Sequence, residues 1–322
     1  MTKTTLRALL GGAALSLALT SSAFATECIA PADAGGGWDF TCRQIGKLLY
    51  DLKLVDAPVQ VTNMAGAGGG VAYTYVVGDR NEDADLIVAA SSATTTRLAQ
   101  NAYAGMAADQ VRWVGAIGGD PGVIVVAKDS PFQTLGDLVA AIKADPTSVT
   151  FAGGSAAGGF DHLKPLMVLK SAGFTDFAKV KYIGLDGGAE AITQTIGGFT
   201  QAMTGDMSEI SGFIKSGEVR ALAVLSAEPV PGFEEIPTAK SQGFDVEVVN
   251  WRGLYVPKGI SDDQFNAWAE KLQTIADSAE WKQIMADNGL APFTKVGADF
   301  QGWVDQVVAD TNQLSKEIGI IQ

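Results

Sequence analysis

Short β-branched runs alternate with helix-like segments along most of this sequence. Strands are predicted at these runs, which are 59–62, 86–90, 111–117, 123–127, 149–152, 179–183, 220–225, 246–251 and 253–256. Most of the runs are apolar throughout, which is typical of parallel strands buried on both faces. A capping-box pattern over 134–137 predicts a helix between two of them. The alternation therefore predicts an α/β fold.

The C-terminal part of the chain reads as mainly helical. Ser261 with Gln264 forms a second capping box, and Phe265 and Trp268 follow it at helical spacing. A further apolar stripe begins at Phe300. These aromatic residues could line a ligand groove, but the stripe spacing is already explained by packing against a sheet, which is the preferred interpretation.

The chain has 322 residues, more than a typical single domain, so two domains are expected and one large barrel is the alternative. Hydrophobic residues make up 47% and charged residues 18%, which excludes a disordered chain. The net charge of −13 argues against nucleic acid as a partner, because phosphate-backbone binding needs a basic surface.

Residues 1–25 are predicted to be a cleavable export signal. Lys3 and Arg7 precede an apolar run over 9–19, and Ala23-Phe24-Ala25 is an A-x-A cleavage site. The run is short for a membrane span, so an uncleaved anchor is the lesser alternative. The mature protein is therefore expected in the periplasm, with a net charge of −15 after the loss of Lys3 and Arg7.

Cys28 and Cys42 are the two cysteines of the chain. Export places them where disulfides persist, so a Cys28–Cys42 bond is expected, and two buried free thiols are the alternative. His162 is the single histidine, so no Cys/His zinc set can be assembled and neither a metal nor a cofactor is expected.

Glycine-rich loops stand between predicted strands and helices at 34–39, 65–70, 153–159 and 184–188. Ser91 and Ser92 form a fifth junction of this kind. Glycine lets a ligand approach the backbone, and a helix start offers free N–H groups with partial positive charge. Such loops can be ordinary turns and caps, but several together favour a polar cleft that holds a carboxylate through backbone amides.

Two enzyme-like interpretations are weaker. The loops lack the last small residue of the dinucleotide fingerprint and the Lys-Ser/Thr of a P-loop. Ser155 with His162 leaves an exported serine hydrolase as the alternative function, but the triad order of such enzymes differs and His162 is expected on the helix that Ser155 opens. The prediction is a binding protein and not an enzyme.

Two arginines are candidates for the site. Arg43 is four residues after Asp39, so on a helix it is expected to face that acid and orient the loop. Arg252, beside Trp251, is the candidate for a direct charge contact with a ligand. Whether either arginine touches the ligand stays open.

The order of several motifs resembles that of one transport family. The matching stretches are Pro31 with 35–37, Asp39 and Arg43, then 63–69, 130–135, 153–163, 182–184, 236–238 and 251–257. Together they resemble the extracytoplasmic solute-binding subunit of tripartite tricarboxylate transporters. The stretch 27–31 with Cys42 is similar to the branch associated with citrate. One departure is Asp83-Ala84-Asp85, where many members carry Asp-Gly-Tyr.

This resemblance implies a two-lobed periplasmic binding protein of the type 2 kind, with two doubly wound α/β domains joined by two crossing strands. Transferred here, lobe one holds 26–122 and 249–322, and lobe two holds 123–248. The lobes would close on a citrate-like tricarboxylate or a dicarboxylate. A monomeric protein would then deliver the ligand to a two-component integral membrane permease.

The resemblance also implies a set of ligand contacts. These are Gly36, Gly37, Trp38, Asp39, Gly66, Ala67, Gly68, Ser91, Ser92, Ser155, Gly158, Gly184, Asp186, Gly187 and Asp206. Asp206 is an unusual neighbour for a carboxylate, so it is expected to accept from a ligand hydroxyl or to orient a water.

Overall fold

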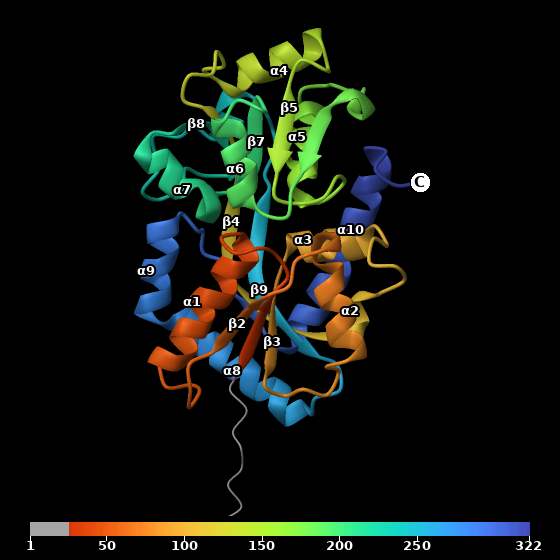
Figure 1. Ribbon diagram of the computed structural model, residues 1–322, viewed down its shortest axis with the longest axis vertical. Coiled ribbons are helices and arrows are strands. Elements are labelled where there is room, and N and C mark those ends of the chain that lie inside the picture. Colours follow the sequence, from red (N-terminus) through yellow and green to blue (C-terminus); the bar gives the residue numbers. More distant parts are fainter. Residues whose placement is uncertain (1–25) are drawn as a thin grey trace, which may run out of the picture.

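Two α/β lobes are stacked along the long axis of the molecule and joined by two long strands (Figure 1). This computed structural model describes residues 26–322, so the predicted signal at 1–25 lies outside the described residues. Within the described part, no helix is long and apolar enough to cross a membrane. The predicted α/β class and two-lobed architecture are confirmed.

In the sheet of the first lobe, β1 lies between β2 and β3 and is parallel to both. Strand β9 pairs antiparallel with the other edge of β3. Its strands are β1 (Glu27–Ala30), β2 (Gln60–Asn63), β3 (Leu86–Ser91), β9 (Val249–Pro257) and β10 (Lys295–Val296). Its helices are α1 (Gly37–Asp51), η1 (Ala67–Gly69), α2 (Gly70–Gly78), α3 (Ser92–Ala99), η2 (Ala108–Gln110), α8 (Asp262–Asp277), α9 (Ala279–Asn288) and α10 (Ala298–Glu317).

The second lobe repeats the scheme, with β7 lying between β4 and the parallel pair β5–β6. Its strands are β5 (Thr150–Gly153), β6 (Lys181–Gly184), β7 (Ala202–Asp206) and β8 (Val219–Val224). Its helices are α4 (Leu135–Ala144), α5 (Phe160–Ser171), η3 (Phe177–Lys179), α6 (Gly188–Ile196), α7 (Met207–Ser216) and η4 (Lys240–Gln242).

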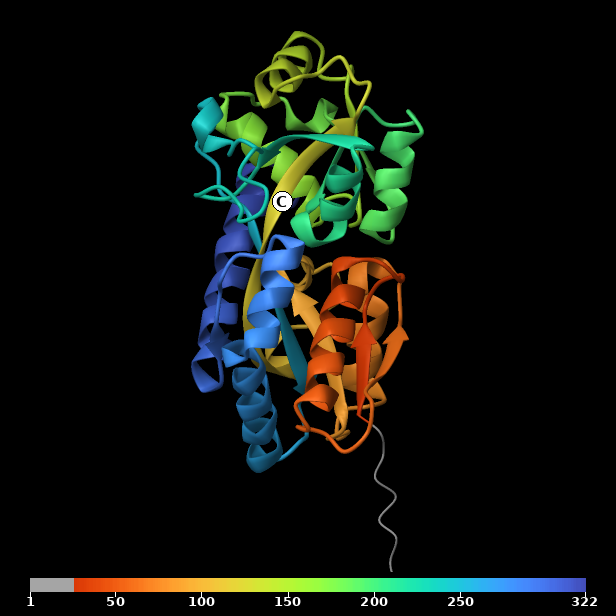
Figure 2. The same ribbon diagram turned by 90° about the vertical axis from the view of Figure 1, so that its left-hand side faces the viewer.

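Strand β4 (Val111–Ala127) belongs to both sheets and pairs with β9 from Val111↔Pro257 to Pro121↔Val249. Figure 2 shows it curving through both lobes. The prediction of separate strands at 111–117 and 123–127 is therefore wrong, and so is the separation of 246–251 from 253–256. The intervening 118–121 stays extended because β9 supplies its pairing partners. A lobe boundary at 122 and 248 stays a prediction.

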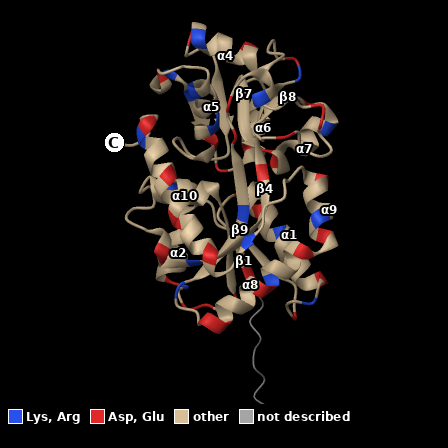
Figure 3. Ribbon diagram, turned by 180° about the vertical axis from the view of Figure 1, so that it is seen from behind, with Lys and Arg blue, Asp and Glu red and all other residues tan. Residues whose placement is uncertain are grey.

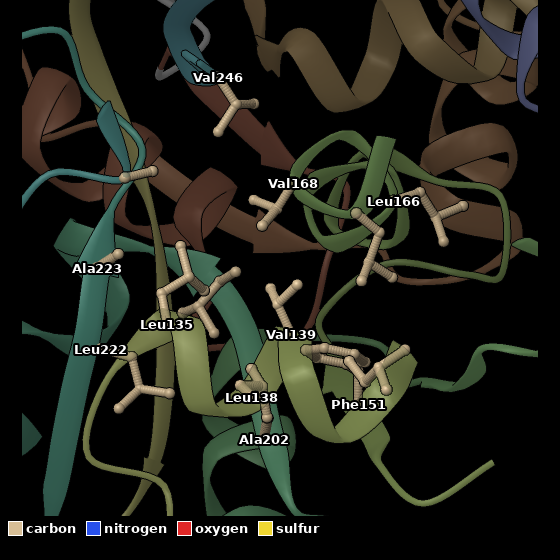
Figure 4. Close-up of a cluster of buried hydrophobic side chains, with 14 of the residues drawn as sticks. Leu135, Leu138, Val139, Phe151, Leu166, Val168, Ala202, Leu222, Ala223 and Val246 are labelled. Carbon is tan, nitrogen blue, oxygen red and sulfur yellow. The ribbon is translucent and has the colours of Figure 1, made fainter. Parts of the chain in front are cut away.

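Each lobe has its own apolar core. In the second lobe, Leu138, Phe151 and Leu166 pack where helices α4 and α5 cover the sheet (Figure 4). In the first lobe, Trp268 and Phe300 are buried, which confirms that the C-terminal aromatics pack in the core. The end of α10 reaches the other lobe, because Ile318 lies in the second-lobe core.

A disulfide joins Cys28 of β1 to Cys42 of α1, as predicted, with 5.6 Å between their Cα atoms. It fixes the helix against the strand that precedes it. The glycine loop over 31–36 lies between the two cysteines, so the bond holds both ends of that loop.

Candidate functional site

A cleft lies between the lobes, where the carboxyl ends of parallel strands from both sheets face one another. Gly36 follows β1, Ser91 ends β3, Gly154 follows β5 and Gly187 follows β6. Ligands of open α/β sheets bind at this edge, because the loops there open the following helices. The lining residues are Ala32, Gly36, Gly37, Trp38, Gly68, Ser91, Ala93, Arg97, Gly154, Ser155, Phe160, Asp161, Gly187, Asp206, Glu209, Asn250 and Arg252.

The glycines of these loops allow close backbone packing. A Cβ atom on Gly37 would lie 2.3 Å from a guanidinium nitrogen of Arg252, and one on Gly154 would lie 2.6 Å from the backbone nitrogen of Gly188. Both positions therefore require glycine. Because α1 begins at Gly37 and α6 at Gly188, two positive helix ends from different lobes border one cleft.

Two serine hydroxyls, one from each lobe, line the cleft. Ser91 Oγ accepts from Trp38 Nε1 at 3.0 Å and from the backbone of Ala93 at 3.1 Å. Ser155 Oγ accepts from the backbone of Asp161 at 3.0 Å. Since these bonds use oxygen lone pairs, the hydroxyl protons are free to donate to a ligand oxygen.

A buried charge network lies under the cleft. The Nη2 of Arg252 is 2.6 Å from Asp120 Oδ2 and 2.9 Å from Asp206 Oδ2. Lys164 Nζ is 2.6 Å from Asp206 Oδ1 and 2.7 Å from Asp161 Oδ1. Burial alone would raise the pKa of Asp206, but Lys164 and Arg252 hold it below its ordinary value. Both oxygens of Asp206 thus already have cationic partners.

Glu209 crosses between the lobes. It lies in the first turn of α7, and its Oε1 accepts from the backbone N–H of Gly37 at 2.7 Å. Burial, with the charges of Asp206 and Asp161 nearby, raises the pKa of Glu209 to about 8, against the opposing effect of Arg252 and Lys164. The carboxyl is therefore largely protonated at neutral pH.

This raised pKa predicts a pH-dependent stability. Between the ordinary pKa of 4.5 and about 8, the folded protein keeps the Glu209 proton and the unfolded chain loses it. Stability from this group is greatest below pH 4.5 and falls as the pH rises through about 8. Glu209→Gln should flatten this fall in urea unfolding at a series of pH values. Glu270→Gln, at an exposed position of α8, is the control, and parallel curves for Glu209→Gln and wild type would refute the assignment.

The cleft brings together eight of the residues predicted as ligand contacts, which are Gly36, Gly37, Trp38, Gly68, Ser91, Ser155, Gly187 and Asp206. Seven lie outside the lining, which are Asp39, Gly66, Ala67, Ser92, Gly158, Gly184 and Asp186. Asp39 bonds instead to Asn63 and Arg43, and Ser92 contacts β9 through Asn250. Contact of any of the fifteen with a ligand stays a prediction.

The sequence interpretation missed several lining residues, above all Arg97, Glu209 and Asn250. Arg97 and Glu209 lie within helices, where a charged residue usually marks a solvated face. Asn250 lies within the strand predicted at 246–251 and gave no separate signal. The two named arginines both turn to acids of the protein: Arg43 Nε bonds to Asp39 at 2.8 Å, as expected, and Arg252 pairs with Asp120 and Asp206.

Ser155 and His162 do not form a nucleophile–base pair. The Nδ1 atom of His162 accepts from the backbone of Gly158 at 2.9 Å, and its ring stacks on Tyr182. Burial lowers the pKa of His162 to about 4. The Ser155 hydroxyl contacts Asp161 and Tyr182 instead.

A family model and two curated proteins match this chain over most of its length. The model of the tripartite tricarboxylate transporter family receptor matches residues 43–320. Protein BugT of Bordetella pertussis is 29% identical over 297 residues, covering 91% of this chain and 89% of that protein. A UPF0065 protein from the TAR-I ttuE-ttuC′ intergenic region of Agrobacterium vitis is 28% identical, covering 89% and 82%.

Solved structures share the fold. The periplasmic binding protein BugD superposes with a TM-score of 0.82 at 24% identity, covering 92% of this chain and 98% of that one. Rpa4515 of R. palustris with adipate gives 0.83 at 20% identity, covering 92% and 97%. MatC of Rhodopseudomonas palustris with bound malate gives 0.77 at 17% identity, covering 90% and 98%.

Proposed function

The chain belongs to the tripartite tricarboxylate transporter receptor family, and we propose that this receptor captures a citrate-like tricarboxylate or a dicarboxylate between its lobes. It then delivers the closed complex to a two-component membrane permease. The receptor acts in the periplasm as a monomer after the loss of residues 1–25. Recognition is by binding alone, without chemistry on the ligand.

One observation carries this proposal. The starts of helices α1 and α6 and the hydroxyls of Ser91 and Ser155, from both lobes, border the same cleft. Backbone donors of this kind favour an anion, although the chain as a whole is acidic. Basic residues are interspersed with acidic ones over the outer helices instead of forming one basic face (Figure 3). Attraction for a carboxylate is therefore local to the cleft.

The two relatives solved with ligands support the same ligand class. Their titles name malate and adipate, which are both dicarboxylates. We propose that residues 26–122 with 249–322 and residues 123–248 form the closing lobes, with β4 and β9 as the hinge. Donors from the two lobes then meet on the ligand only in the closed form.

A thermal-shift screen tests this function. Citrate, malate or adipate should raise the melting temperature, because a ligand at 100 times its Kd stabilises the folded state by about 2.7 kcal/mol. Glucose and AMP, which lack carboxylates, should give no shift. Stabilisation by the neutral sugar alone would contradict the proposal. Hydrolysis of an ester that is lost in Ser155→Ala would favour the hydrolase instead.

A further inference from the structure

Two cations line the cleft, Arg97 and Arg252, and their surroundings differ. The Arg252 side chain is 3% exposed and bonds to Asp120 through Nε and Nη2. It also contacts Asp206. Lys164, below the lining, is likewise held between Asp161 and Asp206. These charges are already compensated by protein carboxylates, so they hold the site together and leave little attraction for a ligand.

Arg97 is not compensated in this way. Among residues 26–322, no carboxylate lies within ion-pair distance of its guanidinium. Its Nη1 makes two long contacts, 3.4 Å to Gln100 Oε1 and 3.5 Å to the Ala157 carbonyl. Its Nε is buried and has no hydrogen-bond partner. Since a guanidinium carries five N–H donors, most of its donor capacity is unused.

The position of Arg97 suits an incoming anion. Arg97 comes from α3 of the first lobe, whereas Ala157 belongs to the β5–α5 loop of the second lobe that also carries Ser155. On its other side, a Cβ atom on Gly68 would lie 3.4 Å from the Nε of Arg97. A larger residue at position 68 would therefore press on the Arg97 side chain, which itself lines the cleft.

The rest of the cleft is acidic. Asp161, Asp206 and Glu209 line it, and Asp120 lies behind Arg252. A ligand with two or more carboxylates can place one near the Ser91 and Ser155 hydroxyls, but for a second one Arg252 and Lys164 offer no free charge, since both are already paired with protein carboxylates. Arg97 offers that second carboxylate a planar set of donors without a competing protein anion.

We propose that Arg97 binds a second carboxylate of the ligand and makes the cleft selective for di- and tricarboxylates over monocarboxylates. This inference rests on the proposed function. The ligand carboxylate replaces the long contacts of Nη1 and uses guanidinium N–H groups that have no partner in the protein. Because Arg97 comes from the first lobe and Ser155 of the second lobe lines the same cleft, a ligand held by both residues would link the two lobes.

Calorimetric titration of Arg97→Gln tests the inference. Adipate and hexanoate are a matched pair that differ by one terminal carboxylate, and citrate and malate extend the series. Arg97→Gln should weaken binding of the di- and tricarboxylates about ten- to hundredfold and change hexanoate binding little. Arg97→Lys should recover part of the loss, because a lysine keeps the charge but not the bidentate geometry.

Arg112→Gln is the control, since it removes the same charge from an arginine that pairs with Asp262 outside the cleft. Equal binding of adipate, citrate and malate by wild type and Arg97→Gln would overturn the role of Arg97 and leave the proposed function intact. An equal loss for hexanoate and adipate would also overturn it, because it would indicate a general structural role. Failure of wild type to bind any carboxylate would overturn both proposals.

Discussion

Replacing Arg252 with methionine is expected to lower the free energy of unfolding by about 3–5 kcal/mol. Methionine keeps much of the side-chain volume, so the loss comes from charge and hydrogen bonds. The substitution leaves Asp120 and Asp206 buried and close together without the guanidinium that bonds to both. Burial already raises the pKa of Asp120 despite Arg252, so loss of the cation favours protonation of that carboxyl.

Urea unfolding of Arg252→Met beside Arg112→Met measures the effect. Arg112 also lies on a crossing strand, but its partner Asp262 has a side chain that is 88% exposed, so its ion pair contributes at most about 1 kcal/mol. Adding Asp120→Asn to Arg252→Met should recover part of the stability, since it removes one stranded charge. Equal losses for the two methionine variants would show that the buried network does not stabilise the fold.

Gly253→Ala is expected to destabilise the protein by at least about 3 kcal/mol, a large cost for one methyl group. Gly253 pairs with Ala90 of β3 and with Ala116 of β4, in the middle of β9. An added Cβ would lie 2.0 Å from the carbonyl oxygen of Gly115 and 2.8 Å from the Cα of Ala116. Both atoms are backbone, so relief of the clash requires the two crossing strands to move apart.

Gly302→Ala provides the opposite result for the same chemical change. Gly302 is inside α10 with nothing within 4 Å of an added Cβ, so alanine should stabilise the helix by roughly 0.5–1 kcal/mol. The urea concentration at the midpoint of unfolding should therefore fall for Gly253→Ala and rise for Gly302→Ala, each compared with wild type. A Gly253→Ala protein as stable as wild type would mean that β4 and β9 can separate at this point without cost.

The fold class was predictable because strands buried on both faces need continuous apolar runs. The continuity of the long strand β4 was harder to predict from the sequence. Residues 118–121 contain two glycines and a proline, which indicate a turn from local sequence, and only their pairing with β9 keeps them extended. Strand β7 was missed because Thr204, Gly205 and Asp206 interrupt any apolar pattern.

The sequence predicted the glycine loops that border the cleft, but it missed some of the charged side chains that line it. Glycine loops after strands mark the cleft edge because loops at the carboxyl ends of strands must meet there. Arg97 and Glu209 gave no such signal, since the chain contains many charged helical residues. Both residues enter the site through contacts between the lobes. Arg97 contacts the carbonyl of Ala157, and Glu209 accepts a hydrogen bond from the backbone N–H of Gly37.

The place of β9 in the sheet order affects the sequence of folding events. In the first sheet β9 lies between β3 and β4, which do not pair with each other. A chain that emerges from the ribosome or a translocation channel therefore cannot complete this sheet until residues 249–257 arrive. The second sheet needs only residues as far as Val224. A nascent chain ending before β9 would hold one finished sheet and one with an open apolar edge, and such long-range closure is slow and prone to aggregation.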